Sequence, residues 1–204
     1  MEKKYVFAEA FLMMIVLQAL LMLIKAAADP LVPATSFAHR VVTMVSMLLL
    51  AGIVSVYAKL RKTQLSVFPA RFSKRYIVYT VIAAVLLAVT PSNFTGGYEP
   101  ILLLLYGSVV TPVYEELVFR GYLWNRLSGV LPRELYVYIW SVLLFSIWHL
   151  GYMVPQMIDG NWFAVMTKLA AGFVYGVILG FVRLKCKNCY AAMLVHGVLN
   201  AVMI

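Results

Sequence analysis

Charged residues and cysteines are both scarce in this sequence of 204 residues. Only 12% of the residues are charged and two are cysteine, whereas 64% are hydrophobic and the mean hydropathy is +0.91. Soluble domains average about 25% charged and roughly 45–50% apolar residues, so the composition excludes a soluble, disordered or fibrous protein. The two cysteines, Cys186 and Cys189, cannot complete a tetrahedral zinc site by themselves. The composition therefore predicts an integral membrane protein.

Seven windows of the sequence are apolar and nearly free of charge. A spanning helix needs about 20 such residues, and each window is too long to be a strand. We predict an all-α, polytopic transmembrane bundle of about seven spans. It would form a single transmembrane domain over residues 1–204, with N-terminal spans in 1–100 and the spans that carry the catalytic motifs in 101–204. The windows are Tyr5–Ile24, Val41–Ala58, Tyr76–Tyr98, Ile101–Leu127, Leu135–Val154, Trp162–Val182 and Tyr190–Ile204.

Acidic residues are few, at 8 against 17 Lys and Arg, which gives a formal net charge of +9. With the N-terminus inside, the predicted cytoplasmic segments 1–4, 59–75, 124–134 and 183–189 hold 13 of these basic residues, and the opposite loops hold 2. This asymmetry predicts a cytoplasmic N-terminus in a multi-pass protein of the cell membrane, with the lipid bilayer as its partner. In a membrane protein such an excess of basic residues is typical of cytoplasmic loops, so we expect no nucleic-acid partner.

The fourth window carries three ionisable residues within six positions, Glu115, Glu116 and Arg120. Each charge costs about 2.5–3.5 kcal/mol near the centre of a bilayer, so this helix must turn its polar face into the bundle or a wet cavity. Glu116 and Arg120 are i,i+4 neighbours, which predicts an ion pair. Glu115 points about 100° away from Glu116, so one carboxylate is predicted to be neutralised and the other to be free for chemistry. Pro112 lacks a backbone N–H and predicts a kink just before the two acids.

Two of the three histidines lie inside apolar windows. His149 is in the fifth window and His196 in the seventh, where Asn200 follows at i+4 on the same face. At about 1.5 Å per residue, these groups and the glutamates reach one layer at or slightly inside the bilayer midplane. Polar groups from three helices at one height indicate a functional site. Lys168, in the sixth window, is interpreted as a snorkelling or helix-contact residue rather than a catalytic base.

Three polar motifs thus occur in order in three windows, and together they resemble a known family. They are similar to the motifs of the CAAX-protease and bacteriocin-processing (CPBP, or Abi) family of intramembrane endopeptidases, which is related to the type II CAAX prenyl proteases. The resemblance covers about residues 101–204. The motifs are Glu115-Glu116-x-x-x-Arg120, Phe145-x-x-x-His149 and His196-x-x-x-Asn200.

This resemblance implies a catalytic role for four of the matching positions. Glu115 would be the general base and, with His149, would bind and activate the attacking water. His196 and Asn200 would stabilise the developing oxyanion. These roles agree with the physical chemistry of the residues. Hydrogen-bond donors aimed at the oxygen of a tetrahedral intermediate stabilise it by several kcal/mol in a site without water.

The resemblance also implies supporting residues. Glu116 and Arg120 would be a supporting pair, and Phe145 would be a packing residue. Many relatives have additional spans, whereas four residues follow Asn200 here. We therefore expect a short last helix, and a lipid or a second subunit of a homo-oligomer to complete the far side of the cavity.

Two mechanisms follow from the resemblance. Members of the family are often labelled metalloproteases, and Glu115, His149 and His196 could form a His₂Glu zinc site with an open water position. The sequence has no HExxH pair, however, and Arg120 disfavours a cation near Glu116. We favour a metal-free glutamate mechanism, with zinc as the alternative cofactor.

The predicted function is that of an intramembrane endopeptidase acting on small peptides or proteins. Candidate substrates are bacteriocin or pheromone precursors, an incoming toxic peptide in self-immunity, or a prenylated CAAX protein. Two other classes stay open: a non-catalytic immunity or scaffold protein of the same fold, and a proton-coupled carrier, since transporters also bury acidic and histidine side chains.

Overall fold

A computed structural model describes residues 3–94 and 96–203, and every regular element within these ranges is helical. The all-α prediction is confirmed. The described residues up to position 94 form three α-helices, α1 (Lys3–Ala28), α2 (Ser36–Leu60) and α3 (Lys74–Ala88). Two short 3₁₀ turns accompany them, η1 (Asp29–Leu31) after α1 and η2 (Pro91–Phe94) after α3.

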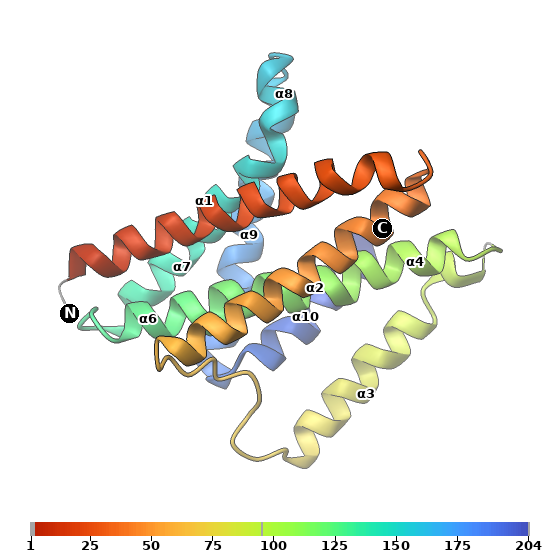
Figure 1. Ribbon diagram of the computed structural model, residues 1–204. Coiled ribbons are helices and arrows are strands. Elements are labelled where there is room, and N and C mark those ends of the chain that lie inside the picture. The colour runs from red at the N-terminus through yellow and green to blue at the C-terminus, as the bar shows by residue number, and fades with distance from the viewer. Residues whose placement is uncertain (1–2, 95, 204) are drawn as a thin grey trace.

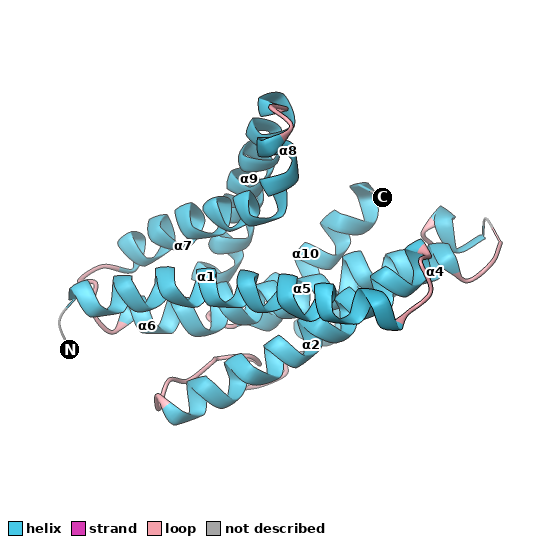
Figure 2. Cartoon of the chain, turned by 45° about the horizontal axis from the view of Figure 1, so that its top comes forward, coloured by secondary structure: helices cyan, strands magenta, loops and turns pink. Residues whose placement is uncertain are grey.

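The fourth window forms one continuous helix from Glu99 to Ser128, in which α-helical and π-helical segments alternate. Figure 2 shows its α-helical segments following one another along one line. In chain order the segments are α4 (Glu99–Leu105), the π-helix η3 (Tyr106–Val110), α5 (Thr111–Glu116), the π-helix η4 (Leu117–Leu123) and α6 (Trp124–Ser128).

The last three windows form two helical hairpins. The first joins the segment that begins with α7 to α9, and the second joins α9 to α10 through a two-residue link. The elements are α7 (Glu134–Trp148), the 3₁₀ turn η5 (His149–Met153), α8 (Val154–Ile158), α9 (Trp162–Cys186) and α10 (Cys189–Met203).

In the described part of the chain, five helical segments are long and apolar enough to cross a membrane: Lys3–Leu31, Ser36–Leu60, Glu99–Ser128, Glu134–Ile158 and Trp162–Cys186. The other two predicted spans coincide with α3 and α10, which have 15 residues each. A helix of that length rises about 22 Å, which is less than the roughly 30 Å of a bilayer's hydrocarbon core. The count of seven spans and the cytoplasmic N-terminus therefore stay predictions.

The long central helix is enclosed by the other helices. α1 and α2 lie side by side, and α2 packs on the central helix (Figure 1). On another side α7 pairs with α9, while α10 lies against η3 and α5. α3 packs on α10 at the edge of the bundle. The acidic residues of the fourth window are thus surrounded by protein.

The link between α9 and α10 positions the last helix. Lys187 ends α9 in the left-handed conformation, with φ 59°, and its N–H donates to the carbonyl of Arg183, as in a helix C-terminal cap. The Asn188 side chain then accepts from the backbone N–H of Ala191 at 3.0 Å and so caps the start of α10. This tight turn aims α10 back along the central helix.

α10 makes its close approach to the central helix at Gly197. A Cβ atom built on Gly197 would lie 2.3 Å from the backbone oxygen of Ser108, so no larger residue fits without separating the two backbones. The contact falls on the π-helical segment η3, where Thr111 N–H donates five residues back to Tyr106. Pro112 follows directly and has no N–H to donate. The proline is therefore accommodated next to a π-helical turn.

Candidate active site

A cavity of about 590 Å³ lies where the central helix meets α7, α9 and α10. Of the residues predicted from the sequence, Glu115, His149, His196 and Asn200 line it, so the structure brings these four together. Glu116 and Arg120 do not line it and are fully buried. The complete lining is Met47, Leu103, Tyr106, Gly107, Thr111, Glu115, His149, Tyr152, Lys168, Ala171, Gly172, Tyr175, His196 and Asn200.

Glu115 is held by two donors that come from another helix. Its Oε1 atom accepts from Trp148 Nε1 at 3.2 Å and from the Tyr152 hydroxyl at 3.3 Å. Trp148 Nε1 also lies 3.0 Å from the Tyr152 hydroxyl oxygen, so the three groups form one small network. These contacts fix the orientation of a carboxylate that is 3% exposed.

Glu116 lies between two nitrogen donors. Arg120 Nη1 donates to Glu116 Oε1 at 3.1 Å, and His196 Nδ1 lies 3.0 Å from the same oxygen. The ion pair predicted from the i,i+4 spacing is therefore present. Arg120 also donates to the carbonyl of Gly176 on α9 at 3.4 Å. The Glu116 carboxylate thus neutralises Arg120 and holds the imidazole of α10.

His149 begins η5 and has a defined tautomer in its neutral form. Its Nδ1 atom lies 2.8 Å from the carbonyl oxygen of Phe145. Because a carbonyl can only accept, Nδ1 carries the proton and Nε2 of the neutral ring is an acceptor. The ring packs against Gly172 of α9, where a built Cβ would lie 2.8 Å from Nδ1. Glycine at this position makes room for the imidazole.

Phe145 connects the two histidines and the buried arginine. Its ring centroid lies 4.8 Å from that of His149 and 6.1 Å from that of His196, in edge-on arrangements. The guanidinium carbon of Arg120 lies 4.2 Å from the same ring centroid, which is a cation–π geometry. The phenyl ring therefore packs against both imidazoles and against the guanidinium of the charged pair.

Asn200 makes a contact that its predicted role does not include. Its Nδ2 atom donates to the carbonyl of Gly107 in the π-helical segment η3 at 2.6 Å. In a π-helical register, Pro112 is the residue whose N–H would have reached Gly107, five positions back. Asn200 therefore supplies a donor for a carbonyl that proline leaves without its backbone partner.

A scan against protein families matches residues 97–202, just over half of the chain, to type II CAAX prenyl endopeptidase Rce1-like. The chain belongs to the Rce1-like family. The resemblance drawn from the three motifs is thereby confirmed at the family level, and the family is one of membrane proteases. Searches of curated proteins and of solved structures gave no match.

Sequence reasoning missed some residues of this candidate site. Trp148 and Tyr152 hold Glu115, and Gly172 accommodates His149. A weak signal existed, because Trp148 directly precedes His149 and Tyr152 follows Trp148 at i+4. Aromatic residues are so frequent in this chain, at 14%, that spacing alone does not single these two out.

The zinc alternative is less well matched by the side chains. Glu115, His149 and His196 line one cavity, yet in the described ranges no three His, Cys, Asp or Glu side chains are grouped closely enough to hold a metal ion. The Nδ1 atoms of both histidines already contact protein oxygens. A His₂Glu site would need the two Nε2 atoms to come together around Glu115. The chelation experiment below tests this alternative.

Proposed function

We propose that this protein is an intramembrane endopeptidase in which Glu115 and His149 activate a water molecule for attack on a peptide bond. The observation that supports this most directly is the separation of the two neighbouring acids. Glu115 opens onto the cavity, whereas Glu116 is paired with Arg120 behind it. One carboxylate is free to take a proton, and the other is committed to structure.

The hydrogen-bond roles around the cavity suit water activation. A water between Glu115 and the neutral His149 would meet an acceptor on each side, the second carboxylate oxygen and the ring Nε2. Both of its hydrogens would then be engaged, which leaves an oxygen lone pair to attack the carbonyl carbon. Glu115 takes the proton as the C–O bond forms and returns it to the leaving nitrogen as the C–N bond breaks.

Asn200 and His196 are proposed to stabilise the oxyanion. An amide nitrogen carries two hydrogens, so Asn200 can donate one to Gly107 and direct the other at the oxyanion. His196 has its Nδ1 against Glu116, so it can donate from Nε2 only as an imidazolium. In that form Glu116 lies between two cations, and the excess positive charge favours the negative transition state.

The substrate is proposed to be a peptide or small protein that reaches the cavity from the bilayer. The name of the family favours a prenylated CAAX protein. Bacteriocin or pheromone precursors, and a toxic peptide in a self-immunity role, are narrower hypotheses for the same chemistry. A gene for a small secreted peptide beside this one would favour these hypotheses.

The test is cleavage by purified protein in lipid nanodiscs. Farnesylated and unmodified peptides that end in a CAAX sequence are incubated with the enzyme, and the products are identified by mass spectrometry. Glu115→Gln should lower kcat/KM by about 100- to 10,000-fold, since a general base contributes on that scale. Glu99→Gln is the matched control, because Glu99 is exposed and starts the same long helix.

The other two function classes give different results in the same preparation. A non-catalytic scaffold would bind the peptide and release no product, and Glu115→Gln would keep that binding. A proton-coupled carrier reconstituted in vesicles would move solute with a pH gradient and leave every peptide intact. Either outcome contradicts the protease proposal.

Chelation separates the two hydrolytic mechanisms. The metal-free mechanism predicts that treatment with 1,10-phenanthroline or EDTA leaves the cleavage rate unchanged. Elemental analysis of the purified protein should then find no stoichiometric zinc. One zinc per chain, together with loss of cleavage on chelation and recovery on adding zinc back, would establish the metalloprotease mechanism instead.

A further inference from the structure

Lys168 is a charge in an otherwise apolar stretch. Between Trp162 and Val182 it is the only charged residue of α9. A lysine near the centre of a spanning helix costs about 2.5–3.5 kcal/mol on insertion scales, and such residues usually face a cavity or a partner rather than lipid. This position therefore needs a functional or structural reason.

The structure places Lys168 at the proposed active site. Its side chain is one of those that line the cavity with Glu115 and His149. Gly172, against which the His149 ring packs, follows four residues later on the same face of α9. Four residues of helix rise about 6 Å. The ammonium group sits on a flexible four-carbon side chain. It can therefore contact a bound peptide only a few peptide residues away from the position that lies at His149.

Lys168 also carries the permanently charged amine or guanidinium group that an incoming anion would meet at the cavity. Among the described residues that line the cavity there is no other lysine or arginine. Arg120, the nearby alternative, is buried and engaged with Glu116 and with the Gly176 carbonyl. Lys168 is exposed, and within the described part of the chain its side chain makes no hydrogen bond or ion pair.

We infer that Lys168 binds the free C-terminal carboxylate of the peptide substrate and so restricts cleavage to bonds close to a chain end. This inference rests on the proposed endopeptidase function. A CAAX sequence is by definition the last four residues of a protein. Four extended residues span at most about 14 Å, so any bond in or beside that motif lies near a carboxylate. A lysine at the cavity complements that charge.

The competing explanation is that Lys168 serves only as a counter-ion to Glu115. A counter-ion would influence the catalytic carboxylate whatever peptide is bound. A carboxylate-binding residue influences only substrates that carry the carboxylate. Two substrates that differ at that group alone therefore distinguish the two roles.

The experiment compares a peptide acid with its C-terminal amide, in the nanodisc assay above. Wild-type protein should cleave the acid with a kcat/KM about 10- to 100-fold above that of the amide, the worth of a hydrogen bond to a charged group. Lys168→Met should remove this preference by lowering cleavage of the acid to the level of the amide. Lys168→Arg should retain most of the preference.

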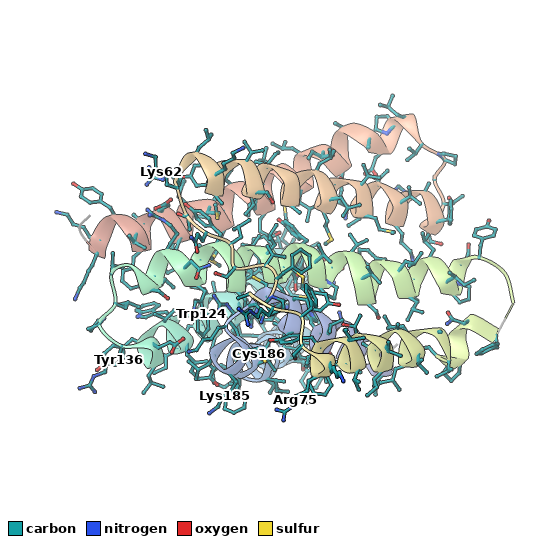
Figure 3. The ribbon with its side chains drawn as sticks, turned by 90° about the horizontal axis from the view of Figure 1, so that it is seen from below. Lys62, Arg75, Trp124, Tyr136, Lys185 and Cys186 are labelled. Carbon is teal, nitrogen blue, oxygen red and sulfur yellow. The ribbon has the colours of Figure 1, made fainter. Side chains whose placement is uncertain are left out.

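Reversing the charge at position 168 should create a new substrate preference, which a folding defect would not produce. Lys168→Glu should prefer a peptide whose C-terminus is extended by an aminoethylamide, which carries a positive charge, over the acid. Lys185→Met is the matched control. It removes a positive charge from the same helix at a residue that points outward from the bundle (Figure 3), and it should keep the wild-type preference.

Each result has one meaning. Equal cleavage of acid and amide by wild-type protein would overturn the inference and leave the endopeptidase proposal intact. An equal loss on both substrates in Lys168→Met, with the acid preference kept, would assign Lys168 the counter-ion role. Absence of cleavage of any peptide by wild-type protein would contradict the proposed function itself.

Discussion

Two clusters in this protein pair a glutamate with an arginine, and they differ in what surrounds them. The Glu9 cluster joins α1 to α2 and α6: the Glu9 carboxylate accepts from Tyr57 at 3.1 Å and from Tyr122, and pairs with Arg126 and Arg61. Its charged side chains stay partly accessible, with Glu9 at 14% and Arg61 at 42%. The Glu116 cluster, of Glu116, Arg120 and His196, has both members of its ion pair at 0%.

The difference indicates that the Glu9 cluster holds helices together, whereas the Glu116 cluster also positions a residue of the proposed active site. Two aromatic hydroxyls and two arginines share the single carboxylate of Glu9, and none of these residues lines the proposed active-site cavity. In the Glu116 cluster the carboxylate also holds His196, which does line that cavity. Burial raises the cost of leaving a charge unpaired. Damage to the Glu116 cluster should therefore affect stability and activity together, whereas damage to the Glu9 cluster should affect stability alone.

The largest expected effect is that of Arg120→Met. This substitution leaves the Glu116 carboxylate buried without its cation and removes the cation–π contact with Phe145. Breaking a buried ion pair on one side costs about 3–5 kcal/mol. We expect a much lower Tm in a thermal unfolding scan and no detectable cleavage. A variant that keeps both the wild-type Tm and its cleavage rate would show that the pair is dispensable.

An intermediate effect is expected at the cavity wall. Gly172→Ala places a methyl group where the His149 ring now packs, so the imidazole must shift. Overpacking of this kind lowers the free energy of unfolding by about 1–3 kcal/mol. The kcat should fall by more than this loss of stability, measured as a lower Tm, would cause on its own. Gly52→Ala is the matched control on α2, which carries Tyr57 of the Glu9 cluster. Apart from the adjoining residues and backbone of α2 itself, no atom lies within 4 Å of its added methyl, so stability should rise by about 0.5–1 kcal/mol.

The smallest effect is expected for Glu9→Gln. The amide keeps a hydrogen-bond acceptor for Tyr57 and Tyr122 and loses the charge that pairs with Arg126. We expect a stability loss of about 1 kcal/mol, as for exposed or partly exposed pairs, with kcat/KM unchanged. Because salt screens accessible charges, the Tm difference from wild type should shrink at high ionic strength. A fall in kcat/KM as large as that of Gly172→Ala would remove the distinction between the two clusters.

Much of the helical architecture was predictable from the sequence. Each of the seven apolar windows contains a helix, because long runs without charge leave helix as the structure that satisfies the backbone in a bilayer. The Glu116–Arg120 pair was also predictable, since residues four apart on a helix are neighbours whatever the rest of the fold does. The prediction that Glu115 faces away from this pair followed from the same geometry.

Contacts between helices were not predictable in this way. The donors to Glu115 come from Trp148 and Tyr152, and the partner of Asn200 is the carbonyl of Gly107. Each contact depends on how two helices are rotated and shifted relative to one another. The π-helical segments add a further change of register that the window pattern does not contain. Lys168 is the clearest example. The sequence shows a lysine in the sixth apolar window, but only the packing of α9 shows that this lysine lines the cavity.

The sequence alone determined that this chain is helical, apolar and supplied with acids and imidazoles that cannot face lipid, because composition and local spacing act within single helices. The packing of the helices against one another determines which of those groups share a cavity, which are paired behind it, and that a lysine lines it. The physical reason is that burial and hydrogen bonding belong to pairs of helices, and the packing at Gly172 and Gly197 sets how closely those pairs approach.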